Sequence, residues 1–409
     1  MTGWSYGDWR PGGERTSFSD ITFDSTLHCG NGHDFAQIEA GQYRFRARCG
    51  LAPYAWRFLL AIESPGDGRE IALEVADFNH EGRTPWHESA TAYSVDGGAT
   101  WLPFPIEWLE IVDWTPTGHA EIDRAYGDAS HVPYGVRYRL TLDAPRILFA
   151  SPTPFTLEYR DRLLSELAQA HPREVQTATI ARTTHSDATG YPVKIACLTA
   201  RGRWSARRRV LVVAGEHAAE SAGVYACEGF MREVLAHSEW LEEHAFFFVP
   251  IFNADGVFYG RTYFNVSRGI TEGPGVNLSA TWHERPAPEQ HDLWRFLEEL
   301  QPELLVSLHN GRHRREMDQF CDPGRGSEAI NDALRRHLGF RLNNAGPPKA
   351  PARLPREAMD CGLTRYGFLT ETLLLERLPG MPTFRDSYIE VGRQLARGYT
   401  EGLMTQCPT

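Results

Sequence analysis

The sequence predicts two domains of different class, an all-β sandwich over residues 1–155 and an α/β domain over residues 156–409. Two observations support this prediction. Between about residues 20 and 150, apolar side chains alternate with polar ones, which is the pattern of half-buried strands. Beyond about residue 172, short apolar runs alternate with amphipathic helical patterns. A chain of 409 residues is long enough for two such domains.

The period-two pattern of the first domain is clearest in three runs, at residues 43–47, 71–75 and 136–142. Such runs are typical of antiparallel strands. Residues 96–98 (Asp-Gly-Gly) predict a tight hairpin turn, because glycine reaches positive φ angles at little cost. We find no acid pair, nucleophile or metal-ligand spacing in this half, and we interpret the Cys-Gly-Asn-Gly-His stretch at residues 29–33 as a turn.

In the second half, four apolar runs are predicted as buried strands, near residues 209–214, 245–252, 304–308 and 367–373. Amphipathic helices are predicted between them, and a last helix over about residues 385–404. Polar and charged side chains stand where several of these runs end. In open α/β sheets, ligands bind at the carboxyl ends of the strands, so this edge is the expected site.

The composition argues against several classes of function. The formal net charge is −11 and no long basic run occurs, so we expect binding neither to nucleic acid nor to an anionic membrane. The longest strongly apolar run, about residues 245–252, is too short to span a bilayer. The first residues lack the pattern of a secretory signal, so a cytoplasmic protein is expected. The seven cysteines are scattered without a CxxC pair, which argues against a cysteine-bound zinc.

Three side chains stand where two of the predicted strands end. His217 and Glu220 are three residues apart in the turn after residues 209–214, and His309 directly follows residues 304–308. A lone His-x-x-Glu pair is more often a surface feature than a metal site. Two imidazoles and one carboxylate, however, form a ligand set of catalytic zinc, which keeps a fourth position open. The sequence therefore suggests a site for one Zn2+ ion.

An acid lies inside the last apolar run, at Glu371. Burying an unpaired carboxylate is costly, so a functional role is expected. In a metal-dependent hydrolase, such a group acts as the general base that takes a proton from water and passes it to the leaving amine. The alternative is a glutamate that faces solvent, and Glu376 is the rival candidate for the base.

Five short segments follow one another along the chain: residues 217–220 (HAAE), 250–256 (PIFNADG), 275–278 (GVNL), 308–309 (LH) and 370–371 (TE). Their order and spacing resemble the zinc carboxypeptidases of the M14 family over about residues 200–375. Any one segment is weak, but five in order are specific. Residues 149–156, following a β domain, look like the cytosolic carboxypeptidase branch, whose best-known members trim glutamates from protein tails.

The resemblance implies a zinc-carboxypeptidase-like α/β domain with a mixed sheet flanked by helices, preceded by a β-sandwich. It implies that His217, Glu220 and His309 are the zinc ligands and that Glu371 is the general base. Asn277 matches the position that hydrogen-bonds the first zinc histidine.

The arginines match less well. Arg268 is our candidate for the arginine that stabilises the oxyanion, with Arg261 in the same loop as the alternative. Where the family usually has an Asn-Arg pair that clamps the substrate's C-terminal carboxylate, this chain has Ser279 and Ala280. Other candidate substrate-binding cations are Arg356, Arg365 and the basic run at residues 312–315.

Together these inferences predict a zinc metallocarboxypeptidase that hydrolyses a peptide or amide bond, with C-terminal acidic residues as candidate targets. One alternative is a deacylase of small N-acyl amino acids. The other is an inactive zinc- or peptide-binding module, suggested by Ser279 and Ala280. The expected partner is a peptide or an acylated amino acid, and the sequence does not indicate an oligomeric state.

Overall fold

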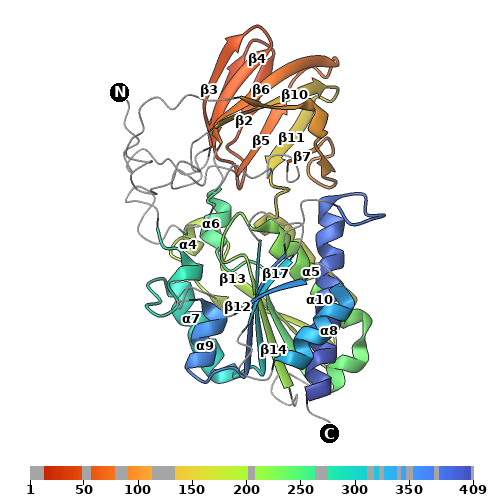
Figure 1. The fold of residues 1–409 in the computed structure, drawn as a ribbon. Coiled ribbons are helices and arrows are strands. Elements are labelled where there is room, and N and C mark those ends of the chain that lie inside the picture. Colours follow the sequence, from red (N-terminus) through yellow and green to blue (C-terminus); the bar gives the residue numbers. More distant parts are fainter. Residues whose placement is uncertain are drawn as a thin grey trace. The chain divides into compact units, whose positions relative to one another are not determined.

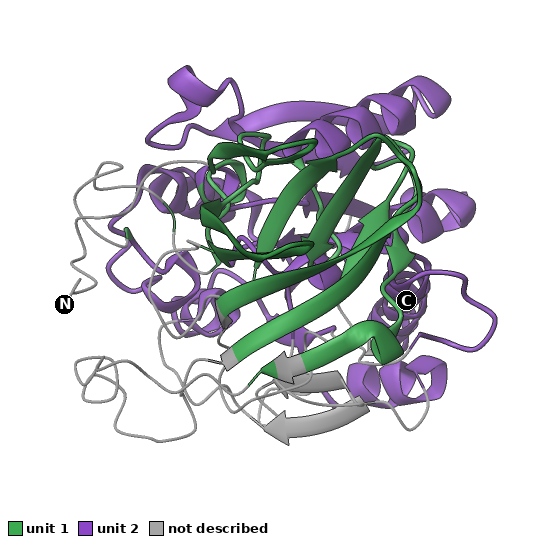
Figure 2. Ribbon diagram, turned by 90° about the horizontal axis from the view of Figure 1, so that it is seen from above, with its two compact units in different colours: residues 1–156, 256–275 green, residues 157–255, 276–409 purple. Residues whose placement is uncertain are grey.

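The computed structural model describes residues 13–47, 57–78, 91–112, 134–200, 208–262, 265, 275–310, 317–321, 327–338, 342–346, 353–372 and 377–406 (Figure 1). The chain contacts divide it into two units, which Figure 2 shows in different colours. The first unit contains residues 1–156 and 256–275, and the second contains residues 157–255 and 276–409. Residues 256–275 thus belong to the first unit although they lie inside the predicted second domain, and the domain limits stay a prediction.

The first unit is built from two β-sheets with the strand orders β1-β2-β5-β11-β7-β8 and β3-β4-β6-β10-β9. The strands of the first sheet are β1 (Arg15–Phe18), β2 (Ile21–Asp24), β5 (Phe58–Glu63), β7 (Ala92–Ser94), β8 (Leu102–Pro103) and β11 (Arg146–Ser151). Those of the second are β3 (Gly32–Glu39), β4 (Gln42–Ala47), β6 (Arg69–Phe78), β9 (Leu109–Val112) and β10 (Tyr134–Leu142). A short 3-10 helix, η1 (Ile106–Trp108), precedes β9.

Buried aromatic side chains join these two sheets. Phe23 of β2 stacks on Phe35 of β3, with ring centroids 5.4 Å apart. Phe58 of β5 meets Phe45 of β4 edge to face, also at 5.4 Å. Two sheets that share one apolar core in this way form a β-sandwich, so the predicted class of the first half is confirmed.

One strand pair departs from the predicted antiparallel pattern, because β4 and β6 run parallel. The strand between them in sequence, β5, pairs within the other sheet. The chain therefore crosses to that sheet and returns in the same direction, which a hairpin cannot do. The predicted hairpin is present: β7 and β8 pair antiparallel around residues 96–98, and Gly97 and Gly98 have φ angles of 75° and 90°.

The second unit contains a mixed eight-stranded sheet with the order β12-β13-β15-β14-β16-β19-β17-β18. Its strands are β12 (Val175–Ala181), β13 (Val193–Leu198), β14 (Arg208–Ala214), β15 (His244–Val249), β16 (Leu304–His309), β17 (Met317–Cys321), β18 (Leu342–Gly346) and β19 (Tyr366–Glu371). The four central strands, β15, β14, β16 and β19, are parallel to one another. The predicted run at residues 245–252 forms a strand only as far as Val249, because Pro250 cannot donate to the sheet.

Helices cover both faces of this sheet (Figure 1). Phe247 of β15 belongs to one apolar cluster with side chains of α7 and α9, whereas Phe248, its neighbour on the strand, meets Phe230 of α5 at 5.5 Å on the other face. On that second face, Tyr399 of α10 packs against Phe368 of β19 at 5.3 Å. The α-helices of the unit are α3 (Leu157–Ala170), α4 (Ser186–Thr189), α5 (Ser221–Ala236), α7 (Pro288–Leu300), α8 (Glu328–Leu338), α9 (Leu354–Asp360) and α10 (Phe384–Gln406). Two 3-10 helices, η3 (Ser238–Glu242) and η4 (Leu278–Ala280), complete it, and α6 (Ala254–Phe258) spans the change of unit.

None of the helices in the described parts of the chain combines the length and the apolar composition that a membrane crossing requires.

Helices α5 and α10 touch through their backbones. A Cβ atom added at Gly229 of α5 would lie 1.9 Å from the carbonyl oxygen of Ile389, and one added at Gly392 of α10 would lie 1.9 Å from that of Ala226. Glycine at these two places lets the helices approach without a side chain between them. This contact holds α5 in place, and α5 begins at the turn that carries the candidate site.

We expect Gly392→Ala to destabilise the protein by up to about 2 kcal/mol, because the new methyl group overpacks, at a cost of about 1–3 kcal/mol, against a carbonyl that cannot move without shifting α5. This cost exceeds the gain of about 1 kcal/mol that alanine brings to a helix interior. The measurement is the free energy of unfolding in urea. The control is Arg393→Ala, the next residue, whose side chain is 42% exposed and whose removal should change the free energy by less than about 0.5 kcal/mol. An unchanged free energy of unfolding for Gly392→Ala would show that the close contact between α5 and α10 does not contribute to stability.

Candidate metal centre

The candidate site lies at the carboxyl ends of β14 and β16. These strands are parallel neighbours, and their register pairs Ala214 with Leu308. The turn after β14 and the last residue of β16 therefore lie side by side. Gly215 makes the turn possible with a φ of 67°, and Asn253 fixes it by donating its backbone N–H to the carbonyl of Gly215 (2.9 Å) and its side-chain amide to that of Glu216 (3.2 Å).

The three residues predicted as metal ligands are brought together at this edge. Potential ligand atoms of His217, Glu220 and His309 all lie within 4.8 Å of one another, and all three side chains are buried. The Nδ1 atoms of both imidazoles face the same carboxylate. The Nδ1 of His217 is 2.7 Å from Glu220 Oε1, and that of His309 is 2.8 Å from Glu220 Oε2.

The outer nitrogen of each imidazole faces an oxygen acceptor. The Nε2 of His217 is 3.1 Å from the amide oxygen of Asn277, as the sequence predicts for this position. The Nε2 of His309 is 3.0 Å from Glu216 Oε2. With an ion held between the two rings and Glu220, each ring would donate through Nε2 to its outer oxygen, since amide and carboxylate oxygens only accept, and Nδ1 would be the nitrogen that faces the ion. The donor set therefore fits a single zinc ion.

Sequence analysis missed Glu216, which supports the site from behind. Its carboxylate is 1% exposed and accepts hydrogen bonds from Trp282 Nε1 (2.6 Å) and from the Ser307 hydroxyl, besides facing His309. The signal that could have found it is its place, next to His217 and two positions after the end of the apolar run at residues 210–214. A carboxylate there is costly unless it is paired.

The electrostatics of this cluster favour a divalent cation. Burial raises the pKa values of the Glu216 and Glu220 carboxyls, but their partners outweigh this effect and lower both pKa values overall. For Glu216 the partners are His309, Ser307 and Trp282, and for Glu220 they are His217 and His309. Burial lowers the pKa of His309, but the two carboxylates outweigh it and raise that pKa to about 10. Burial lowers the pKa of His217 overall. Without a metal, the cluster thus holds two carboxylates against one imidazolium. Because a bound metal would displace the proton of His309, a divalent cation would balance the charge of the two carboxylates.

Glu371, the predicted general base, is the last residue of β19. The parallel register of β16 and β19 pairs its Cα with that of His309. Neighbouring strands are about 4.8 Å apart and paired residues project to the same side of a sheet. Glu371 is half-buried on this side, and Thr372 fixes the strand end by donating its N–H (2.7 Å) and its hydroxyl (2.8 Å) to the carbonyl of His309.

Several predicted residues are not placed at the cluster. Arg268, the basic run at residues 312–315 and the rival base Glu376 lie outside the described residues. Arg261 belongs to the first unit, where it is buried and its carbonyl accepts a hydrogen bond from Arg57 (2.7 Å).

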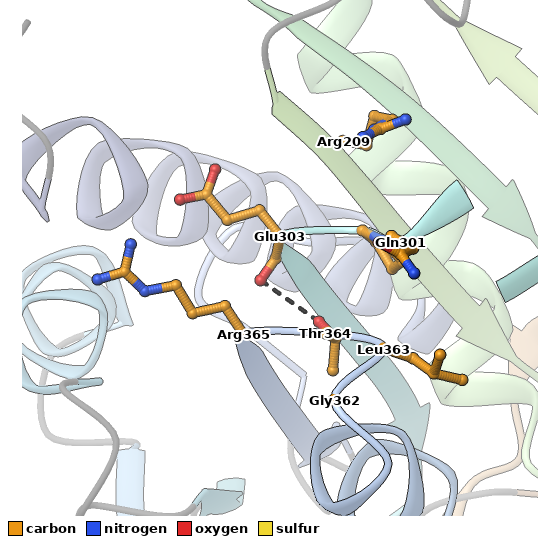
Figure 3. A pocket seen from close by; sticks show the side chains of 8 residues that line it. Arg209, Gln301, Glu303, Gly362, Leu363, Thr364 and Arg365 are labelled. Carbon is orange, nitrogen blue, oxygen red and sulfur yellow. Dashed lines mark hydrogen bonds between the residues drawn. The ribbon is translucent and has the colours of Figure 1, made fainter. Parts of the chain in front are cut away.

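Arg356 and Arg365, the two candidate arginines that precede Glu371 in the sequence, have neighbours other than the predicted metal ligands. Arg365 precedes β19, so the six residues of this strand, roughly 20 Å, separate it from the edge that carries Glu371. Arg356 lies on α9 and pairs with Asp360 at 2.7 Å, one turn further along the helix. Arg365 lines an open pocket (Figure 3) together with Arg209, Gln301, Pro302, Glu303, Gly362, Leu363 and Thr364. The structure therefore does not bring Arg365 to the cluster.

A different arginine, which sequence analysis did not select, lies near the cluster. Arg353 directly precedes α9, and its guanidinium donates to the hydroxyl of Ser279. Ser279 lies in η4, which begins directly after Asn277, the partner of His217. The charge of Arg353 adds to the effect of burial in lowering the pKa of His217.

Comparisons with known proteins agree with this geometry. Residues 161–311 match the family model of the M14 peptidases, described as zinc carboxypeptidase. No curated protein sequence matches the chain. A metallo-carboxypeptidase from Burkholderia cenocepacia has a similar structure, with a TM-score of 0.72 and 15% identity over 95% of this chain and 100% of that one. A metallo-carboxypeptidase from Pseudomonas aeruginosa has a TM-score of 0.70 and 16% identity over 94% of this chain and 99% of that one.

The two kinds of comparison cover different parts of the chain. The family model includes the turn of His217 and Glu220 as well as His309. The structural similarity extends over both halves and shows that the β-sandwich belongs to the shared fold. Residues 161–311 are therefore similar to the M14 zinc carboxypeptidases, and the chain as a whole shares the fold of solved metallo-carboxypeptidases, the N-terminal sandwich included.

Proposed function

We propose that this protein is a zinc-dependent hydrolase that cleaves a peptide or amide bond and removes C-terminal residues, acidic ones among them. One observation carries the proposal. Two imidazole Nδ1 atoms and one carboxylate converge at a buried strand edge, and Glu371 ends the neighbouring strand in register with His309.

His217, Glu220 and His309 would hold the ion. When bound in such a site, zinc polarises the scissile carbonyl and makes water nucleophilic near neutral pH. The protein's part is to present the two Nδ1 lone pairs, which Asn277 and Glu216 do by accepting from the outer nitrogens.

In this proposal Glu371 removes the proton from the attacking water and delivers it to the leaving nitrogen. Its half-buried position beside His309 supports both tasks, because burial removes part of the hydration of the carboxylate. For the oxyanion we retain Arg268 as the candidate, with Arg261 as the alternative.

The substrate class is inferred from the chemistry of ligands that such a site could hold. The Pseudomonas aeruginosa carboxypeptidase is in complex with (2-guanidinoethylmercapto)succinic acid, a ligand with two carboxylates and a guanidino group. A peptide with an acidic C-terminal residue likewise carries two. Deacylation of small N-acyl amino acids is the second candidate, because these substrates present the same amide bond and the same free carboxylate as a peptide C-terminus. Release of amino acid from a panel of N-blocked dipeptides and N-acyl amino acids separates the two activities.

We expect Glu371→Gln to lower kcat by roughly 10²–10⁴-fold while stoichiometric zinc is retained, because the amide cannot accept the proton of the attacking water. Single-turnover hydrolysis and metal analysis of the same sample measure the two quantities. Glu376→Gln is the decisive comparison. If this second variant loses the activity and Glu371→Gln keeps it, the general base must be reassigned to Glu376.

We expect Glu216→Gln to weaken zinc binding by roughly 10–100-fold, because the outer nitrogen of His309 loses its carboxylate partner. Competition with a chromogenic chelator measures the affinity. Glu228→Gln is the matched control, since Glu228 is also buried but its carboxylate binds Tyr159 and Arg232 instead. Equal zinc affinities for the Glu216→Gln variant and the wild type would contradict a positioning role for Glu216.

A further inference from the structure

We propose that Arg353 binds a carboxylate of the substrate beside the metal centre and thereby determines which amides the protein accepts. The proposal rests on the proposed function of the site, but its test includes a binding measurement that does not depend on hydrolysis.

The first argument is position. Arg353 donates to the hydroxyl of Ser279, which is fully buried in η4. This short helix follows Asn277, whose amide oxygen faces His217 Nε2 at 3.1 Å. The guanidinium is therefore tied to the same turn that contacts a predicted metal ligand.

The second argument is that this turn is held rigidly. Gln290 of α7 donates to the carbonyl of Leu278 at 2.9 Å and to the hydroxyl of Thr281 at 3.1 Å. The Thr281 hydroxyl in turn donates to the carbonyl of Asn277 at 2.9 Å. A guanidinium anchored on such a turn loses little further entropy when it binds a ligand.

The third argument is charge. Arg353 is half-buried, and among the described residues no carboxylate lies within ion-pair distance of it. Arg285, in contrast, lies 3.9 Å from Glu357 and stacks on the ring of Trp294 at 4.3 Å. A guanidinium has five N–H donors, and the bond to Ser279 uses one of them. The remaining donors can form the bidentate pair that recognises a carboxylate.

The fourth argument is what the turn lacks. Ser279 and Ala280 stand where the family resemblance leads us to expect an Asn-Arg pair, and neither side chain carries charge. Arg353 brings a cation to this turn from a segment more than 70 positions away. The carboxylate it binds can be the terminal one or that of an acidic side chain, since both have the same geometry and charge.

The test is peptide binding to zinc-loaded Glu371→Gln protein, in which turnover is suppressed, measured by titration calorimetry. Four N-blocked dipeptides form the probe set: one ending in Glu and one in Gln, each as the free acid and as the C-terminal amide. We expect the peptides that carry the recognised carboxylate to bind tightest. Adding Arg353→Met should weaken their binding by roughly 10–100-fold and leave the others unchanged. If the substitution removes the difference in affinity between free acids and amides, Arg353 binds the terminal carboxylate. If it removes the difference between peptides ending in Glu and in Gln, Arg353 binds the side-chain carboxylate.

Three further variants sharpen the result. Arg353→Lys should recover part of the affinity, because the ammonium keeps the charge but not the planar fork. Ser279→Ala should weaken binding less than Arg353→Met and keep the preference for a carboxylate. Arg295→Met is the control, since Arg295 is 75% exposed on α7 and pairs with Asp292.

The reference is the zinc-loaded Glu371→Gln protein, called the parent. The proposal is overturned if adding Arg353→Met, with zinc content and thermal midpoint unchanged, leaves the affinity for all four peptides the same as in the parent. It is also overturned if the parent shows no preference for any carboxylate. Failure of the proposed function looks different, because a protein with Glu371 intact would then bind the peptides selectively without cleaving them.

Discussion

The site depends on one shared carboxylate. Glu220 faces the Nδ1 atoms of both His217 and His309, at 2.7 and 2.8 Å, and so joins the end of β14 to the end of β16. Burying this carboxylate is tolerable only because both partners are held at the right distance. That distance follows from the parallel register of the two strands and from the close contact of α5 with α10 behind the turn. The geometry of the centre is therefore a property of the whole α/β unit.

The two histidines are supported differently, and the difference has a physical consequence. The outer nitrogen of His309 faces a carboxylate, Glu216, whereas that of His217 faces the neutral amide of Asn277. A carboxylate makes an imidazole more basic than an amide does, so His309 is the stronger electron donor of the pair. Glu216 itself is fixed by Trp282 and Ser307. This arrangement strengthens one ligand without adding a second full charge beside the other.

The sequence predicted those parts of the fold and site that depend on local patterns. Strands β14, β16 and β19 are largely apolar, and the polar residues at their ends could be assigned to one edge because parallel strands end together. The parallel pairing of β4 with β6 was not predictable, because it depends on β5 joining the other sheet. Arg353 carries no local signal, since its role depends on the fold bringing it to Ser279.

The residues proposed for metal binding and proton transfer come from different elements of this unit than the residue proposed for substrate binding. The predicted ligands and Glu371 sit at strand ends, where the sheet fixes their spacing, whereas Arg353 comes from the segment before α9. A segment of this kind can change its cations without disturbing the metal centre, which explains how a chain can lack the expected clamp and still keep its ligand set. The buried charges of the cluster weigh against a module that binds peptides without a metal. A buried cluster of two carboxylates and two imidazoles costs several kcal/mol of desolvation for each ion. A bound divalent cation offsets that cost, whereas a module that only held peptides would be more stable with apolar side chains at these positions.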